Sequence, residues 1–158
     1  MKKQEKTNVM RLLDQKQISY KEHTYETDSA LSGKEVAELL HQDPDMVFKT
    51  LVTVGASREH YVFVVPVTRE LNLKKAAKAV GEKNIEMIKS KELLPLTGYI
   101  HGGCSPIGMK KFFRTTVDET AMLFETIMFS GGKIGYQVEM NPADLSKIID
   151  FEYGDICD

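Results

Sequence analysis

The chain has 158 residues, 42% of them apolar and 28% charged, a balance that fits one folded domain with a single core. No apolar run approaches the roughly 20 residues of a membrane span, and no apolar stretch follows the N-terminal lysines as it would in an export signal. The two cysteines are too few for a disulfide framework and lack the spacing of a zinc site. We therefore expect one domain over residues 1–158, located in the reducing cytoplasm.

Local signals in the first half of the chain alternate between helix and strand. Thr7 or Asn8 can cap a first helix, and Ser32 and Glu35 have the capping-box spacing that opens a second one. Two valine-rich runs separated by a short loop predict a hairpin in the centre of a sheet. The expected elements are a helix from 8 to about 17, a strand over 18–25, a helix over 33–40, and the paired strands 47–54 and 61–67.

The second half predicts a basic helix followed by short strands. Apolar residues at helical spacing from Leu73, ended by Gly81, leave Lys74, Lys75 and Lys78 on the other faces of the helix. Ten Lys and Arg against four Glu lie in residues 69–114, so this region is a candidate surface for a polyanion, although lysine-rich helices are often only solvated. The pattern indicates an α+β or mixed α/β domain. Further expected elements are strands over 85–88, 112–117, 123–129 and 134–140, a helical turn after 90, a helix start at 141–142 and a last strand near 151.

A single lysine interrupts the apolar start of the first hairpin strand. Lys49 follows Phe48 and precedes Thr50 and Leu51, and a lysine buried there needs either an anionic partner or a path to solvent. It is therefore a candidate ligand-binding residue. The alternatives are an edge lysine whose side chain reaches water, or a pair with a structural carboxylate.

Small residues cluster in two later segments. Segment 98–108 contains Gly102, Gly103 and Pro106, and glycines allow main-chain groups to approach a ligand such as an acyl ester or a phosphate. Taken alone, a Gly-Gly pair more often marks a tight turn. Segment 130–135 begins with Ser-Gly-Gly, and it either faces the same pocket or only closes a hairpin.

One cysteine and histidine pair is the candidate for nucleophilic chemistry. Cys104 lies three residues after His101, so a thiol hydrolase stays an alternative, although no third orienting group stands out. The sequence has no metalloprotease, P-loop or dinucleotide-binding motif. Metal, nucleoside-triphosphate and dinucleotide chemistry therefore lack support.

Five ordered blocks of the sequence resemble the YbaK/EbsC family of tRNA-editing domains, which includes the editing insertion of bacterial prolyl-tRNA synthetases. The resemblance implies a mixed, mostly antiparallel sheet or a barrel-like core with surrounding helices. It also implies removal of an amino acid from the 3′ end of tRNA, without a metal or an organic cofactor. The blocks span nearly the whole chain, at 7–13, 47–51, 71–78, 97–108 and 130–133.

The resemblance also implies roles for individual residues. Lys49 would position the substrate and stabilise charge, and Gly102 and Gly103 would hold the aminoacyl group through main-chain contacts. In the family branch that acts on cysteinyl-tRNA, the substrate's thiol attacks its own ester carbonyl and leaves as a thiolactone, so no enzyme nucleophile is needed. The remaining expected contacts are with the substrate, at Tyr20, Thr50, Ser105, Pro106, Ser130 and Gly131, and with tRNA, at Lys74 and Lys78.

Two positions depart from the family pattern. Cys104 stands where the glycine loop usually has an aliphatic residue, and Ile134 replaces a commonly basic residue. The first departure could bring redox sensitivity, and the second could weaken a contact with tRNA.

The leading hypothesis is a free-standing deacylase of Cys-tRNA(Pro), and also of Cys-tRNA(Cys), that depends on a factor such as prolyl-tRNA synthetase for tRNA selection. One alternative keeps the activity but changes the substrate to Ala-tRNA(Pro) or another small aminoacyl group. Another alternative is a non-catalytic tRNA-binding or regulatory protein. The presence of Lys49, Thr50 and both loop glycines favours the enzyme.

Overall fold

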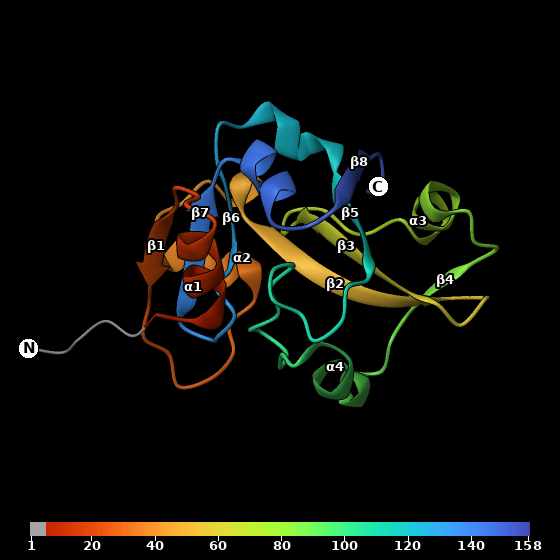
Figure 1. Ribbon diagram of the computed structural model, residues 1–158, viewed down its shortest axis with the longest axis horizontal. Helices are drawn as coiled ribbons and strands as arrows, with labels where there is room; N and C mark the ends of the chain where they lie inside the picture. The colour runs from red at the N-terminus through yellow and green to blue at the C-terminus, as the bar shows by residue number, and fades with distance from the viewer. Residues whose placement is uncertain (1–5) are drawn as a thin grey trace, which may run out of the picture.

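The computed structural model describes residues 6–158, which form two β-sheets that share one core and are surrounded by helices (Figure 1). The lysines at positions 2 and 3 lie outside the described residues. One sheet has the strand order β1-β7-β6, and the other has the order β4-β2-β3-β5-β8. The strands are β1 (Lys21–Thr24), β2 (Phe48–Gly55), β3 (His60–Pro66), β4 (Ile85–Met87), β5 (Arg114–Asp118), β6 (Ile127–Ser130), β7 (Tyr136–Met140) and β8 (Phe151–Gly154).

The helices begin and end at residues whose chemistry favours those positions. The capping box predicted at the second helix is confirmed, because Oγ of Ser32 accepts from the N–H of Glu35 (3.2 Å) and the Glu35 carboxylate accepts from the N–H of Ser32 (2.9 Å). Gly81 ends the third helix with φ of +76°, which a side chain would disfavour. The helices are α1 (Asn8–Gln15), α2 (Gly33–Leu39), α3 (Leu73–Val80) and α4 (Ser90–Thr97), with 3₁₀ helices η1 (Pro44–Met46), η2 (Glu119–Leu123) and η3 (Pro142–Lys147).

Most strand pairs are antiparallel. The pairs β2–β3, β2–β4, β1–β7 and β6–β7 run antiparallel, whereas β5 pairs in parallel with both β3 and β8. A parallel bridge between Val47 and Met128 joins the two sheets. The expected mixed, mostly antiparallel sheet is therefore confirmed, and the predicted hairpin lies at its centre.

The core shared by the two sheets and a second core on the α3 side of the five-stranded sheet hold these layers together. In the larger one, α1 buries Met10 and Leu13 against residues of both sheets, including Phe129. On the other face of the five-stranded sheet, Phe63 packs with α3 and with Ile156. Each of these side chains contributes about 1.5–3 kcal/mol by leaving water. The strand β2 lies between the two cores and is thereby fixed on both faces.

The strand predicted over 123–129 is wrong in its first part. Glu119–Leu123 form the helix η2, because the carboxylate of Asp118 accepts from N (3.2 Å) and Oγ1 (2.6 Å) of Thr120 and caps the turn. The strand begins only at Ile127. Leu123 is 77% exposed, so its apolar character does not mark a buried strand position.

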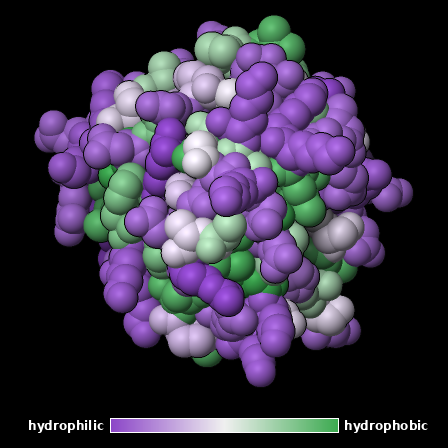
Figure 2. Space-filling model, turned by 90° about the vertical axis from the view of Figure 1, so that its right-hand side faces the viewer, coloured by the Kyte–Doolittle hydropathy of each residue, from purple (hydrophilic) through white to green (hydrophobic). Residues whose placement is uncertain are grey.

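The surface on the side of α3 and β4 is covered mainly by hydrophilic side chains (Figure 2). Lys74 and Lys78 are exposed on α3, as predicted. Lys75, which was predicted to project with them, is only partly exposed and pairs with Asp155 at 3.1 Å. Within residues 6–158, no helix has the length and apolar content needed to cross a membrane.

Candidate active site

A pocket of about 600 Å³ opens beside the first half of β2, where the two sheets meet. Its wall includes five consecutive β2 residues, Phe48 to Val52. Apolar side chains from α2, from the chain after β4 and from β6 form much of the remaining surface. Its polar lining residues include Lys49, Thr50, Glu70, His101, Ser130 and Gln137.

Lys49 supplies the pocket with a cation. Its side chain is 32% exposed, and Nζ lies 3.8 Å from Oε2 of Glu70, whose own side chain is 80% exposed. An ion pair this long and this exposed contributes little to stability. The lysine is therefore neither tied to a buried structural carboxylate nor held away from an incoming ligand.

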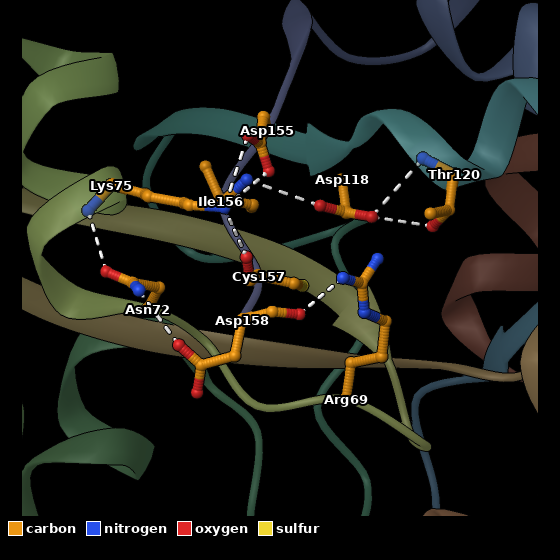
Figure 3. A network of polar contacts seen from close by, with 9 residues as sticks. All are labelled: Arg69, Asn72, Lys75, Asp118, Thr120, Asp155, Ile156, Cys157 and Asp158. Atoms are coloured by element: carbon orange, nitrogen blue, oxygen red, sulfur yellow. Dashed lines mark hydrogen bonds and ion pairs between the residues drawn. The ribbon is translucent and has the colours of Figure 1, made fainter.

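The segment that carries Glu70 is held in place by the chain after β8 (Figure 3). The N–H of Asp158 donates to the Glu70 carbonyl (3.1 Å), and the N–H of Asn72 donates to the Ile156 carbonyl (2.8 Å). The Asn72 side chain also donates to the Asp158 carboxylate (2.8 Å). These contacts fix the main chain at this rim of the pocket and leave the Glu70 carboxylate exposed.

Thr50 follows Lys49 on β2 and also lines the pocket. Its Oγ1 is buried and has no hydrogen-bond partner among the described residues. A buried hydroxyl without a partner costs about 1–3 kcal/mol, and such groups are rare in folded proteins. Thr50 therefore lies where a ligand could complete its hydrogen bonding, and contact with the substrate stays a prediction.

The two loop glycines have different surroundings. Gly102 lines the pocket with φ of +88°, and an added Cβ would lie 2.9 Å from Cβ of Ala30. Gly103 is buried, donates its N–H to the Ile100 carbonyl (3.0 Å), and has the main-chain nitrogen of Ile134 3.4 Å from the position of an added Cβ. The glycine loop thus packs on segment 130–135, and Gly102 is the member of the pair that reaches the pocket.

Segment 130–135 both contributes to the pocket and closes a hairpin. Ser130 lines the pocket, and its Oγ accepts from the N–H of Gly132 (3.1 Å). Gly131 is buried and donates its N–H to the Tyr136 carbonyl (2.9 Å), which closes the turn between β6 and β7. Gly131 is not a lining residue, so its role toward a substrate stays a prediction.

Three other predicted substrate contacts lie outside the pocket wall. Ser105 and Pro106 are buried, and Oγ of Ser105 accepts from the N–H of Ile107 (3.2 Å). Tyr20 is half-buried near Asp14, and burial raises the pKa of its hydroxyl. These residues support neighbouring elements in the structure, and their direct contact with a ligand also stays a prediction.

The thiol of Cys104 is not activated as a nucleophile. Burial raises its pKa to about 12, so the thiol is neutral at pH 7, whereas nucleophilic cysteines need a depressed pKa. The pKa of Tyr99 is also raised to about 12, mainly by burial and to a smaller extent by the nearby Cys104. The Tyr99 hydroxyl donates to the Ile107 carbonyl. The thiol-hydrolase alternative therefore loses support.

Several lining residues were not identified from the sequence. Gln137 is 3% exposed and exchanges two side-chain hydrogen bonds with Gln42, of 2.6 and 3.0 Å. Alternation of polar residues in β7 indicates a polar face there, but a partner 95 residues away cannot be found from spacing. Other lining residues that the sequence did not mark as site residues include Tyr25, Leu31, Glu70, Met87, Ile88 and Leu93.

Comparisons with known proteins agree with this fold. Residues 27–148 match the family described as aminoacyl-tRNA editing domain. A protein of Enterococcus faecalis, provisionally named Cys-tRNA(Pro)/Cys-tRNA(Cys) deacylase EbsC, is 44% identical over 156 residues, which cover 98% of this chain and 95% of that protein.

Two crystal structures share the fold at low sequence identity. The hypothetical protein APE2540 has a TM-score of 0.84 at 20% identity, covering 95% of this chain and 99% of its own. A provisionally named trans-editing enzyme for prolyl-tRNA synthetase has a TM-score of 0.80 at 23% identity, covering 96% of this chain and 98% of its own.

The chain is therefore an enzyme of the class that edits aminoacyl-tRNA. It belongs to the aminoacyl-tRNA editing domain family, and the family resemblance inferred from the five sequence blocks is confirmed.

Proposed function

We propose that the chain removes cysteine from Cys-tRNA(Pro), and also from Cys-tRNA(Cys), in the cytoplasm. The 44% identity to EbsC over nearly the whole length supports this substrate class, because the name of that protein assigns it this activity. The structural observation that carries the proposal is the ammonium of Lys49 in the pocket, which lies 3.8 Å from an exposed Glu70 carboxylate. Such a cation is available to a charged or developing anionic group of the substrate.

The chemistry that we infer uses the thiol of the substrate. Its sulfur attacks the ester carbonyl, the new C–S bond replaces the C–O bond to the 3′ oxygen, and the thiol proton passes to that oxygen. The products are cysteine thiolactone and tRNA with a free 3′ hydroxyl, and water then opens the thiolactone to cysteine. The raised pKa of Cys104 supports this route, because the cysteine that lines the pocket is not a thiolate.

Lys49 has a positioning and charge-stabilising role in this scheme. An ammonium beside the ester stabilises the negative charge that develops on the carbonyl oxygen during attack. Holding the 3′ end also brings the thiol and its own carbonyl into a reactive arrangement, which is the main contribution an enzyme can make to an intramolecular step.

Selection of the tRNA by a second factor, such as prolyl-tRNA synthetase, is part of the proposal. A pocket of about 600 Å³ has room for the 3′ end of the substrate alone.

The exposed Lys74 and Lys78 are candidates for contact with the tRNA backbone. The double variant Lys74→Glu, Lys78→Glu should bind tRNA more weakly and with a smaller salt dependence, and unchanged binding would place the contact elsewhere.

The decisive experiment measures amino acid release from Cys-tRNA(Pro), Ala-tRNA(Pro) and Pro-tRNA(Pro), with the wild type and Lys49→Ala side by side. We expect selective release of cysteine that is lost in the variant. S-methylcysteinyl-tRNA(Pro) is the matched substrate control, because it lacks the thiol proton and should stay charged. Release of alanine instead would keep the activity and change the substrate. Release of no amino acid would favour a binding or regulatory protein.

A further inference from the structure

The wall that β2 gives to the pocket is formed by the edge of the strand. Five consecutive residues, Phe48 to Val52, line the pocket. Successive side chains of a strand point to opposite faces of the sheet, so a pocket on one face would be lined by alternate residues only. The pocket therefore faces the edge of β2, where main-chain N–H and C=O groups point.

Hydrogen bonds at both ends of the β2–β3 ladder show which main-chain groups point to that edge. The N–H of Gly55 donates to the Glu59 carbonyl (2.8 Å), and the N–H of Val67 donates to the Val47 carbonyl (2.8 Å). In an antiparallel ladder every second residue bonds to the partner strand, so the odd-numbered residues of β2 face β3. The N–H and C=O of Thr50 consequently face the pocket.

Neighbouring strands cover this edge on both sides of Thr50 but not at Thr50. The strand β4 pairs with β2 only over Thr53 to Gly55, and Ile88 adds one bond from its N–H to the Val52 carbonyl (3.4 Å). On the other side, β6 bridges to the chain at Val47. Within residues 6–158, these pairings leave the edge groups of Thr50 without a strand partner.

The pattern of groups along this edge matches the edge of an adenine ring. Hydrogen-bond acceptors and donors alternate along this edge. Their order is the carbonyl of Phe48, the N–H of Thr50, the carbonyl of Thr50 and the N–H of Val52. Adenine carries an N6–H donor beside the N1 acceptor, which pair with one such carbonyl and one such N–H. The uncovered stretch is shorter than a typical added strand, which favours a small planar group over a peptide.

Apolar side chains flank the plane in which such a ring would lie. A base bonded to a strand edge lies in the plane of the sheet, between side chains that project above and below it. Leu51 packs with the core on the α3 side of the sheet, and Ile88 packs with the core on the opposite side. Both residues line the pocket. The two faces of a base would therefore contact apolar surface.

We propose that the β2 edge at Thr50 binds the adenine of the 3′-terminal nucleotide of tRNA through main-chain hydrogen bonds. This inference rests on the proposed function, because that function supplies the terminal adenosine. Every tRNA ends in the same nucleotide, so recognition of this base fixes the ester in the pocket whichever tRNA carries it. The ammonium of Lys49 and the hydroxyl of Thr50 then act on other parts of the substrate.

Stable substrate analogues with single-atom changes in the base test this proposal. The reference is 3′-cysteinylamino-3′-deoxyadenosine, whose amide resists cleavage, and its affinity for the wild-type protein is measured by titration calorimetry. The purine analogue lacks the 6-amino group, and the 1-deaza analogue lacks N1. Each change leaves a main-chain partner unpaired, so each should weaken binding roughly 10-fold or more. The 3-deaza analogue, altered on the opposite side of the ring, is the matched control and should bind like adenine.

Two results would overturn the proposal. Equal affinity for the adenine, purine and 1-deaza analogues would show that the edge does not contact the base. An equal loss with the 3-deaza analogue would show that stacking alone holds the ring. Failure of the proposed function would be seen separately, because deacylation of unmodified Cys-tRNA(Pro) is measured by turnover and base recognition by binding without turnover.

Discussion

Replacing Lys49 with alanine distinguishes a functional lysine from a structural one. The ammonium lies 3.8 Å from the Glu70 carboxylate, and the two side chains are 32% and 80% exposed. Such pairs contribute about 0–1 kcal/mol, so Lys49→Ala should change the free energy of unfolding by less than about 1 kcal/mol. For a chain of this length the melting temperature should then shift by at most roughly 2–4 °C.

The effect on catalysis should be much larger than the effect on stability. Removing a group that stabilises the developing oxyanion typically costs about 3–4 kcal/mol, or roughly 100- to 1,000-fold in rate. The assay is single-turnover deacylation of Cys-tRNA(Pro), with thermal unfolding measured on the same preparations. Glu70→Gln is the matched control, because it removes the same ion pair and leaves the ammonium. It should keep wild-type stability and deacylate at least as fast as the wild type.

Three outcomes would refute this reasoning. A destabilisation of more than about 2 kcal/mol in Lys49→Ala, well above the range for exposed ion pairs, would show that the lysine is structural. Parallel losses of activity in Lys49→Ala and Glu70→Gln would show that the ion pair itself is required. Wild-type activity in Lys49→Ala would remove the ammonium from the mechanism.

Three further substitutions have different expected outcomes. Thr50→Val keeps the side-chain shape and removes a buried hydroxyl that has no hydrogen-bond partner within residues 6–158. The variant should therefore be more stable than the wild type by about 1–3 kcal/mol, while kcat/KM falls. Unchanged turnover would show that the hydroxyl does not contact the substrate. Gly102→Ala places a side chain at φ of +88° and should destabilise by about 1–3 kcal/mol in a denaturant titration, and an unaltered midpoint would contradict the strained geometry. Cys104→Ile should retain activity, and loss of activity would return the thiol to the mechanism. Burial raises the pKa of the Cys104 thiol from 9.0 to about 12, so the folded state binds the thiol proton more tightly than the unfolded state. The wild type should therefore lose stability as the pH rises from 9 toward 12. The isoleucine variant has no thiol at this position, so its loss of stability over the same pH range should be smaller.

The helix ends could be predicted from the sequence because their causes are local. The reciprocal hydrogen bonds of Ser32 and Glu35 connect residues three positions apart, and Gly81 ends α3 through its own backbone conformation. The same kind of local signal was missed at Asp118. Its carboxylate caps η2 and displaces the strand that the apolar residues around Leu123 had indicated.

The pocket could be predicted only in part, because its shape depends on pairings between distant segments. Lys49 interrupts an apolar run and is visible in the sequence, but its contact with Glu70 depends on how the chain after β8 holds the segment before α3. The free edge at Thr50 exists because β4 begins to pair only at Thr53, and no spacing in the sequence encodes that limit. Burial of Cys104, which decides its protonation, likewise follows from tertiary packing.

The strand β2 carries the Lys49 ammonium, the Thr50 hydroxyl and the open main-chain edge. Phe48 and Val52, each 3% exposed, anchor this strand in the core, so these groups keep their relative positions better than groups on a loop would. Other segments of the chain, which include Gly102 and Ser130, supply the rest of the pocket lining. If the 3′ adenosine is fixed on β2, we expect the amino acid to contact these other segments. Discrimination between cysteine and other amino acids should then depend on them, whereas loss of the β2 contacts should weaken every aminoacyl-tRNA substrate to a similar degree.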